Sequence, residues 1–200
     1  MTWYEFLLFV HIAMAAIWVG GGAMIQFFAL RALKATDPLR MAEFAGDVEY
    51  IGNRVFVPAS LLAVVSGVWL VIDSEFWGFG DDWIVIGLIL FAVTFLAGLL
   101  FFGPESGRIK KQIEAEGPTS PAVQARIQRI LALSRADLMV LFLLIYDMAV
   151  KPEWGDLSLW VALAGFAALA GVLVRHGLNA RVGGASAVPS ESYSSSSTSS

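Results

Sequence analysis

Few ionisable side chains lie inside the long apolar stretches of this sequence, and these few could carry chemistry. His11 lies in an apolar run over residues 3–30, where Glu5 is the other ionisable side chain. Asp147 and Lys151 stand four residues apart near the end of a later run, so a helix would place them on one face. Ionisable groups within membrane helices are costly and normally face a partner. We therefore expect one polar cluster of His11, Asp147 and Lys151, with Asp147 and Lys151 as an ion pair.

His11 begins a stripe of residues on one face of the expected first helix. Helical spacing from His11 leads to Trp18 and Gly22, a large aromatic ring and a residue without a side chain. A neutral imidazole is a good axial ligand for haem, and a glycine beside an aromatic ring leaves space for a flat macrocycle. The first hypothesis is therefore a membrane protein that binds haem b or another porphyrin through His11, Trp18 and Gly22.

Two other hypotheses stay open. One is a small transporter or metal-handling protein, in which His11, Met14 and Met148 would offer the soft nitrogen and sulfur ligands that Cu(I) prefers. The other is a structural membrane protein without a ligand, in which Asp147 pairs with Lys151 and His11 donates to a backbone carbonyl. The sequence assigns no catalytic residue.

The composition is that of an integral membrane protein. Of 200 residues, 58% are hydrophobic and only 15% are charged, which is far from the usage of soluble globular proteins. The chain has no cysteine, which excludes a disulfide framework and a thiolate metal site. The net charge is −4 and there is no basic cluster with interleaved aromatic residues, so a nucleic acid is not an expected partner. The expected partner is the lipid bilayer, with a homo-oligomer left open.

Long apolar runs predict an all-α, multi-pass membrane bundle over residues 1–182. A helix needs roughly 17–25 apolar residues to cross the hydrocarbon core, and five segments meet this length: about 3–30, 55–72, 83–102, 131–150 and 157–174. A short amphipathic helix over residues 38–48 is expected to lie at the membrane surface, and Gly103-Pro104 is expected to end the third span. The Ser-rich tail over residues 183–200 is expected to be disordered.

Basic residues and tryptophans predict how the bundle crosses the membrane. Of the thirteen Lys and Arg residues, ten fall in two connections and two in the C-terminal tail, all on one side, and only Lys151 falls on the other side. The positive-inside rule then predicts an N-terminus outside and a cytoplasmic C-terminus, with the cell membrane as the location. An aromatic belt at the outer interface is expected from six tryptophans: Trp3, Trp69, Trp77, Trp83, Trp154 and Trp160.

The same residues carry a family resemblance. Over roughly residues 1–155 the chain resembles a family of predicted bacterial integral membrane proteins of unknown function, through Phe9-Val10-His11-Ile12, Trp18-Val19-Gly20-Gly21, Val57-Pro58-Ala59, Ser66-Gly67, Asp147-Met148 and Lys151-Pro152. The first span is also similar to that of HemJ-type membrane protoporphyrinogen oxidases, which carry a His-Ile and Trp-x-x-Gly pattern and bind haem. It is similar as well to that of CopD-type copper-resistance membrane proteins. These two resemblances imply haem at His11 and copper handling, respectively.

Overall fold

The described part of the chain is built from helices. The computed structural model describes residues 1–34, 38–117 and 119–179, and the nine elements that it contains there are all helical. In chain order they are α1 (Trp3–Lys34), α2 (Pro38–Ile51), η1 (Gly52–Phe56), α3 (Val57–Ile72), α4 (Asp82–Ala97), η2 (Gly98–Phe102), α5 (Gly103–Glu116), α6 (Pro121–Val150) and α7 (Leu157–Asn179). The all-α prediction is confirmed for these residues, and the tail over residues 183–200 lies outside them.

Two pairs of α-helices are joined into continuous rods by short π-helices. α2, η1 and α3 follow one another without a break, and so do α4, η2 and α5. Pro58 and Pro104 stand in the first turn of α3 and α5, directly after the π-helices. A proline ring clashes with the carbonyl four residues earlier in a regular α-helix, and a wider π turn relieves this clash. Each rod can therefore continue past a proline that would otherwise end it.

These rods correct two expectations from the sequence. The segment over residues 38–48 is not a separate surface helix, because α2 runs on into α3 and residues Gly46–Ile72 form one apolar helical stretch. Likewise, Gly103-Pro104 does not end the third span, because η2 leads into α5 within the stretch Asp82–Glu116. In both places the π turn overrides the helix-breaking effect of proline.

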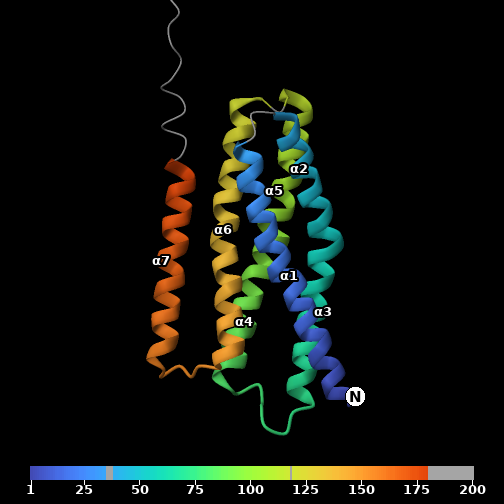
Figure 1. Ribbon diagram of the computed structural model, residues 1–200, viewed down its shortest axis with the longest axis vertical. Helices are drawn as coiled ribbons and strands as arrows, with labels where there is room; N and C mark the ends of the chain where they lie inside the picture. Colours follow the sequence, from blue (N-terminus) through green and yellow to red (C-terminus); the bar gives the residue numbers. More distant parts are fainter. Residues whose placement is uncertain (35–37, 118, 180–200) are drawn as a thin grey trace, which may run out of the picture.

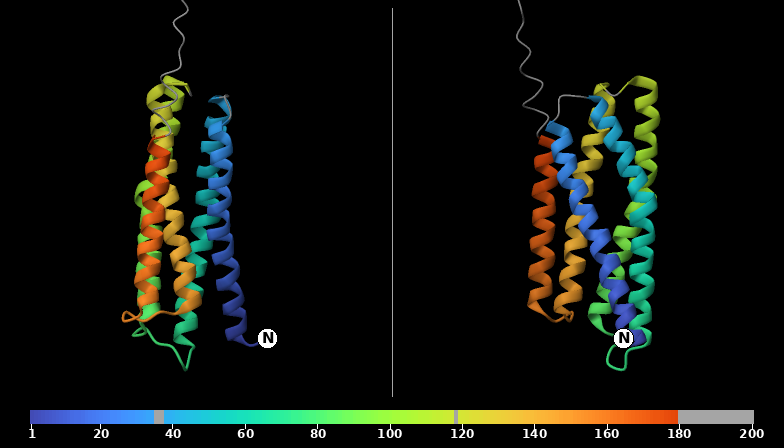
Figure 2. Two further views of the ribbon diagram at one scale, coloured as in Figure 1. Left: turned by 60° about the vertical axis from the view of Figure 1, so that its left-hand side comes forward. Right: turned by 45° about the vertical axis from the view of Figure 1, so that its right-hand side comes forward.

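The two rods, α1, α6 and α7 lie side by side along the long axis of the molecule, with α7 at one edge next to α6 (Figures 1 and 2). Residues 73–81 and 151–156 connect rods at the same end. There, the backbone N–H of Trp154 donates to Oδ2 of Asp82 across the two connections, at 2.9 Å. This contact aligns the start of α4 with the end of α6.

We call this end of the bundle the tryptophan end, because it holds six tryptophans: Trp3, Trp69, Trp77, Trp83, Trp154 and Trp160. The rings of Trp3 and Trp69 lie 6.5 Å apart between centroids, and Trp160 Nε1 donates to the backbone oxygen of Trp154. The predicted gathering of the tryptophans at one end is thereby confirmed.

Four helical stretches among the described residues are long and apolar enough to cross a membrane: Trp3–Ala29, Gly46–Ile72, Asp82–Glu116 and Leu157–His176. The predicted span over residues 131–150 is not among them. It belongs to α6, a helix of 30 residues that carries more charges than a typical span: Arg126, Arg129, Arg135, Asp137 and Asp147.

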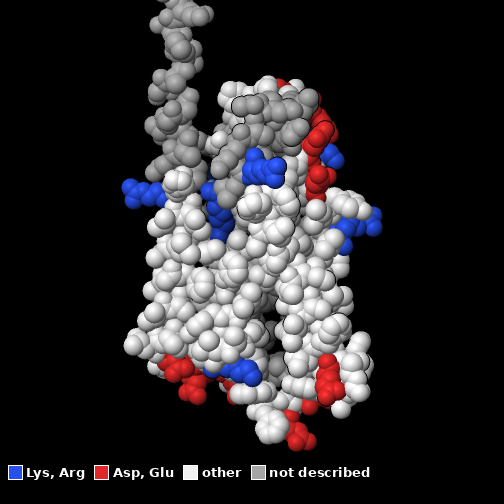
Figure 3. Space-filling model, viewed as in Figure 1, with Lys and Arg blue, Asp and Glu red and all other residues white. Residues whose placement is uncertain are grey.

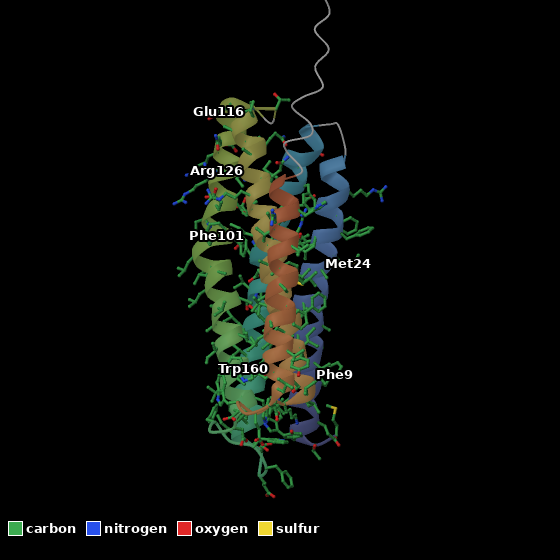
Figure 4. The ribbon with its side chains drawn as sticks, turned by 90° about the vertical axis from the view of Figure 1, so that its left-hand side faces the viewer. Phe9, Met24, Phe101, Glu116, Arg126 and Trp160 are labelled. Atoms are coloured by element: carbon green, nitrogen blue, oxygen red, sulfur yellow. The ribbon has the colours of Figure 1, made fainter. Side chains whose placement is uncertain are left out.

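The surface between the two ends of the bundle is apolar. Figure 3 shows a broad band on one face without Lys, Arg, Asp or Glu, between ends that carry these residues. Large apolar side chains project away from the bundle (Figure 4), with exposed fractions of 65% for Phe9, 54% for Met24, 40% for Phe101 and 54% for Trp160. Such a surface suits contact with lipid chains, which cover apolar groups without cost.

Glycines let neighbouring helices approach one another closely. A Cβ on Gly21 of α1 would lie 2.5 Å from Cε1 of Phe56, and one on Gly87 of α4 would lie 2.3 Å from Cε of Met148. Close packing at small residues is a main source of helix association in membranes, because lipid chains are as apolar as the helices. The glycines at 21 and 87 therefore hold α1 against η1 and α4 against α6.

Replacing Gly21 by alanine should destabilise the bundle. Overpacking costs about 1–3 kcal/mol, more than the roughly 1 kcal/mol that alanine gains over glycine within a helix. We expect Gly21→Ala to lower the Tm of the detergent-purified protein. Gly20→Ala is the matched control, because no atom lies within 4 Å of a Cβ at Gly20, and its Tm should equal or exceed that of the wild type. Equal Tm values for the two variants would contradict the packing of α1 on Phe56.

Candidate functional site

His11 is held between α1 and α3. Its Nδ1 lies 2.7 Å from the backbone oxygen of Ala63, and Nδ1 must carry the proton because a carbonyl can only accept. Gly67 packs against the ring, since a Cβ there would lie 2.9 Å from His11 Cε1. In the neutral ring, the lone pair of Nε2 remains available. The hypothesis of a structural membrane protein without a ligand predicts that His11 donates to a backbone carbonyl, and this hydrogen bond is present.

Asp147 and Lys151 do not form the predicted ion pair. Both carboxylate oxygens of Asp147 are buried without a hydrogen-bond partner among the described residues, whereas Lys151 Nζ lies 4.2 Å from the ring centroid of Trp77. The cause is the backbone of Lys151, which has a φ of 53° and ends α6 with an N–H bond to the Asp147 carbonyl. A left-handed residue leaves the helical line, so the four-residue spacing no longer brings the two side chains together.

Asp147 packs on α4 instead of on His11. A Cβ on Gly87 would lie 2.9 Å from Asp147 Oδ2. One turn earlier on α4, Trp83 has a buried Nε1 without a partner in the described part of the chain, and its ring lies 5.0 Å from Lys151 Nζ. Because the Asp147 oxygens have no hydrogen-bond partner there, the predicted cluster with His11 is not assembled. His11 belongs to the contact of α1 with α3, and Asp147 to that of α4 with α6.

A cavity of about 260 Å³ lies among α1 to α6, away from the tryptophan end. Its walls come from α1, from both rods that contain a π-helix, and from α6. Trp18 and Gly22 line this cavity, whereas His11 does not. The three residues predicted to surround one cofactor are therefore divided between two places, and together they do not fit a single macrocycle.

Gln26 is the most deeply buried polar side chain that α1 contributes to this cavity. It is 9% exposed, its Nε2 donates to Oγ of Ser134, and its Oε1 is buried without a partner among the described residues. Asp137 stands one turn after Ser134 on α6 and also lines the cavity. Gln26, Ser134 and Asp137 therefore bring acceptor oxygens from two helices to one wall.

The hydroxyl groups of the cavity wall also act as acceptors. Four hydroxyl groups donate their hydrogen to a carbonyl of the same helical segment and keep at least one oxygen lone pair: Ser60, Thr94, Ser106 and Ser134. Ser134 uses its other lone pair to accept from Gln26. A ligand that carries N–H or O–H donors would satisfy these oxygens better than a ligand that carries only acceptors.

The charged residues that line the cavity are both acidic, Glu49 and Asp137, and the described residues place no Lys, Arg or His on its wall. Arg135 stands two residues from Asp137, a spacing at which helical side chains do not face each other. Aromatic rings complete the wall and can attract a cation through their faces: Trp18, Phe44, Phe56, Phe95 and Phe102. The cavity thus suits a small cation with an apolar part.

The sequence reasoning missed this polar wall, although a signal for part of it was present. Gln26 follows Gly22 by four residues, so the stripe that leads from His11 to Gly22 continues into a polar side chain. Ser134 and Asp137 are three residues apart and share a helix face for the same reason. That these two faces meet depends on the packing of α1 against α6, which no spacing within one helix predicts.

An all-helical bundle with long apolar helices, an apolar surface and a mostly apolar cavity that holds a few polar side chains defines an integral membrane protein. A family model described as "Predicted integral membrane protein (DUF2269)" matches residues 5–152, and the chain belongs to this family. The match begins in the first turn of α1 and ends just past α6, so α7 lies outside it. The predicted membership of a membrane-protein family of unknown function is confirmed. No curated protein and no solved structure matches the chain.

Proposed function

We propose that this protein is a small membrane transporter that takes up organic cations, with the central cavity as its substrate site. The supporting observation is the cavity wall, where two carboxyl groups, the free oxygen of Gln26 and four hydroxyl oxygens accompany aromatic rings and no basic side chain among the described residues. The substrate class that meets this chemistry is a small amine in its ammonium form, with a short apolar or aromatic group.

The energetics favour a cation at this place. A carboxylate within the membrane costs roughly 2.5–3.5 kcal/mol on insertion scales. A positive charge about 4 Å away recovers about 4 kcal/mol at an effective dielectric constant of about 20. Substrate binding would therefore offset part of the cost of keeping Asp137 on the cavity wall, because desolvation of the ammonium group takes back some of this gain.

Three compounds that share one skeleton test the proposal. Phenethylamine is a cation at neutral pH, 2-phenylethanol is neutral and phenylacetate is an anion. We expect phenethylamine to raise the Tm of the detergent-purified protein in proportion to the logarithm of its concentration above its Kd. At a hundred times its Kd it should stabilise the folded protein by about 2.7 kcal/mol. The neutral and anionic compounds should have little effect, and Asp137→Asn should weaken phenethylamine binding at least ten-fold.

Asp47→Asn is the matched control, because Asp47 is exposed on α2 and does not line the cavity. Its affinity for phenethylamine should equal that of the wild type. Similar Tm shifts for all three compounds would indicate partition into the detergent micelle, and the proposed function would then be wrong. Uptake of phenethylamine by proteoliposomes would separate a carrier from a binding protein.

We further propose that α6 is a fifth membrane span and that the tryptophan end faces outward in the cell membrane. α6 starts beside α5, where Val123 and Ile127 pack on Ile109, and it ends beside the start of α4. It therefore runs back along a rod that is long enough to cross. The twelve basic residues assigned to the opposite side support the orientation through the positive-inside rule.

Single cysteines test this topology, since the chain has none of its own. Gly78→Cys lies at the tryptophan end, and Thr119→Cys lies at the opposite end, both at exposed positions. With a membrane-impermeant thiol reagent on intact cells, the cysteine at 78 should react, and the one at 119 should react only after lysis. The reverse pattern would invert the orientation, and equal labelling of intact cells would disprove a crossing between the two positions.

A second candidate function is ligation of haem iron or copper by Nε2 of His11 alone, since Trp18 and Gly22 line the cavity instead and Met148 packs on Gly87. The observation that favours it is the bond from Nδ1 to Ala63, because histidines that bind metals usually donate their other ring N–H to such a partner. Haem would supply redox or porphyrin chemistry, and His11 would hold it at Nε2.

An absorption spectrum and metal analysis of the purified protein test this second function. A Soret band or bound copper that is lost in His11→Ala and kept in His176→Ala would support it, since His176 is exposed on α7. A wild-type protein produced with added haem precursor and copper that carries neither would rule it out.

A further inference from the structure

The two rods that contain π-helices share a sequence pattern. Gly-x-x-x-Phe-x-Pro-x-Ser occurs at residues 52–60 and again at residues 98–106. In each copy the first five residues form the π-helix, η1 or η2, and the proline lies in the first turn of the next α-helix. The two rods follow each other in the chain and run in opposite directions, so the copies meet the cavity from antiparallel helices.

The first copy leaves the backbone carbonyl of Asn53 without a helical donor. The N–H of Val57 donates to the carbonyl of Gly52, five residues earlier. The carbonyl of Asn53 would next accept from Val57 in an α-helix or from residue 58 in a π-helix. The N–H of Val57 already donates to the Gly52 carbonyl, and Pro58 has no N–H. The Asn53 carbonyl is therefore left over, without a helical hydrogen-bond donor.

The second copy repeats this result. The N–H of Gly103 donates to the carbonyl of Gly98, and the next residue is Pro104. The carbonyl of Leu99 therefore lacks a donor for the same reason as that of Asn53. The carbonyls of Asn53 and Leu99 are thus left without a helical donor at equivalent positions of the two rods.

Both carbonyls belong to residues of the central cavity wall. Asn53 and Leu99 line the cavity, and so do the glycine, phenylalanine and serine of each copy: Gly52, Phe56, Ser60, Gly98, Phe102 and Ser106. A carbonyl without a partner inside a membrane bundle costs free energy, and such groups occur where they line a cavity or bind a ligand. Carbonyls of interrupted helices are known ligands for cations in membrane transport sites.

We propose that the carbonyls of Asn53 and Leu99 accept hydrogen bonds from the ammonium group of the substrate in the central cavity. This inference rests on the proposed function and assigns the atoms that recognise the charged group. The repeated pattern then has a binding role: the glycine and proline shape the π turn, and the turn presents one carbonyl to the ligand. A cation with N–H donors uses these carbonyls, and a quaternary ammonium ion does not.

Restoring an N–H at the prolines tests the inference, because Pro58→Ala and Pro104→Ala each supply an N–H five residues after the left-over carbonyl, where a continued π turn lets that carbonyl accept it. Kd values for phenethylamine and for phenethyltrimethylammonium are measured in detergent, for example by calorimetry. Each variant should bind phenethylamine about ten-fold more weakly, the effect of one hydrogen bond to a charged group. Binding of the quaternary ion should stay within two-fold, roughly, of the wild type. The Tm of the variants should be maintained or raised, since alanine favours a helix more than proline does.

Pro121→Ala is the control, because Pro121 lies in the exposed first turn of α6 and outside the cavity wall. It should leave both Kd values unchanged. If the wild type binds phenethylamine and the two cavity variants bind it equally well, the carbonyl assignment is wrong while the proposed function stands. An equal loss for both ligands would indicate a changed cavity shape and would also overturn the assignment. A wild type that binds neither ligand would overturn the proposed function itself.

Discussion

A membrane interior supplies no water to peptide groups, so every backbone N–H and C=O has to find its partner within the protein. Long α-helices meet this constraint, and the described residues of this chain follow it almost throughout. This constraint is hardest to meet at Pro58 and Pro104, because each proline lacks a backbone N–H in the middle of a rod. The π turns keep both rods continuous, and the two residues whose carbonyls are left without a helical donor, Asn53 and Leu99, both line the central cavity.

Contacts between helices also depend on the lipid environment. Because lipid chains are as apolar as the helices, burial of apolar groups contributes little to helix association, and close packing at small residues contributes more. Three glycines carry such contacts: Gly21 receives Phe56, Gly67 receives the ring of His11, and Gly87 receives Met148 beside Asp147. The close approach at Gly67 also brings His11 to the Ala63 carbonyl, which fixes the ring tautomer. The contact of His11 with α3 therefore sets both the packing of α1 on α3 and the tautomer of the imidazole ring.

The bundle keeps two polar regions apart. At the tryptophan end, Lys151 lies over the rings of Trp77 and Trp83, and Asp147 is buried one turn further in. Away from that end, Gln26 and Asp137 face the cavity with acidic and hydroxyl groups around them. The two regions differ chemically. The tryptophan end combines a lysine over aromatic rings with the exposed carboxyl groups of Asp73, Glu75, Glu153 and Asp156, whereas the cavity combines two acidic side chains with hydroxyl groups and aromatic rings.

The sequence by itself determined the class of the protein, because hydropathy, length and the positions of the tryptophans are properties of single segments. Only the tertiary structure decided which polar residues meet. Asp147 and Lys151 separate because Lys151 adopts a left-handed backbone, and His11 parts from Trp18 because successive turns of α1 face different helices. Spacing along one helix specifies which residues share a face of that helix. The partner of that face depends on how the helices pack against one another. That packing is decided by glycine contacts and π turns that involve residues far apart in the chain.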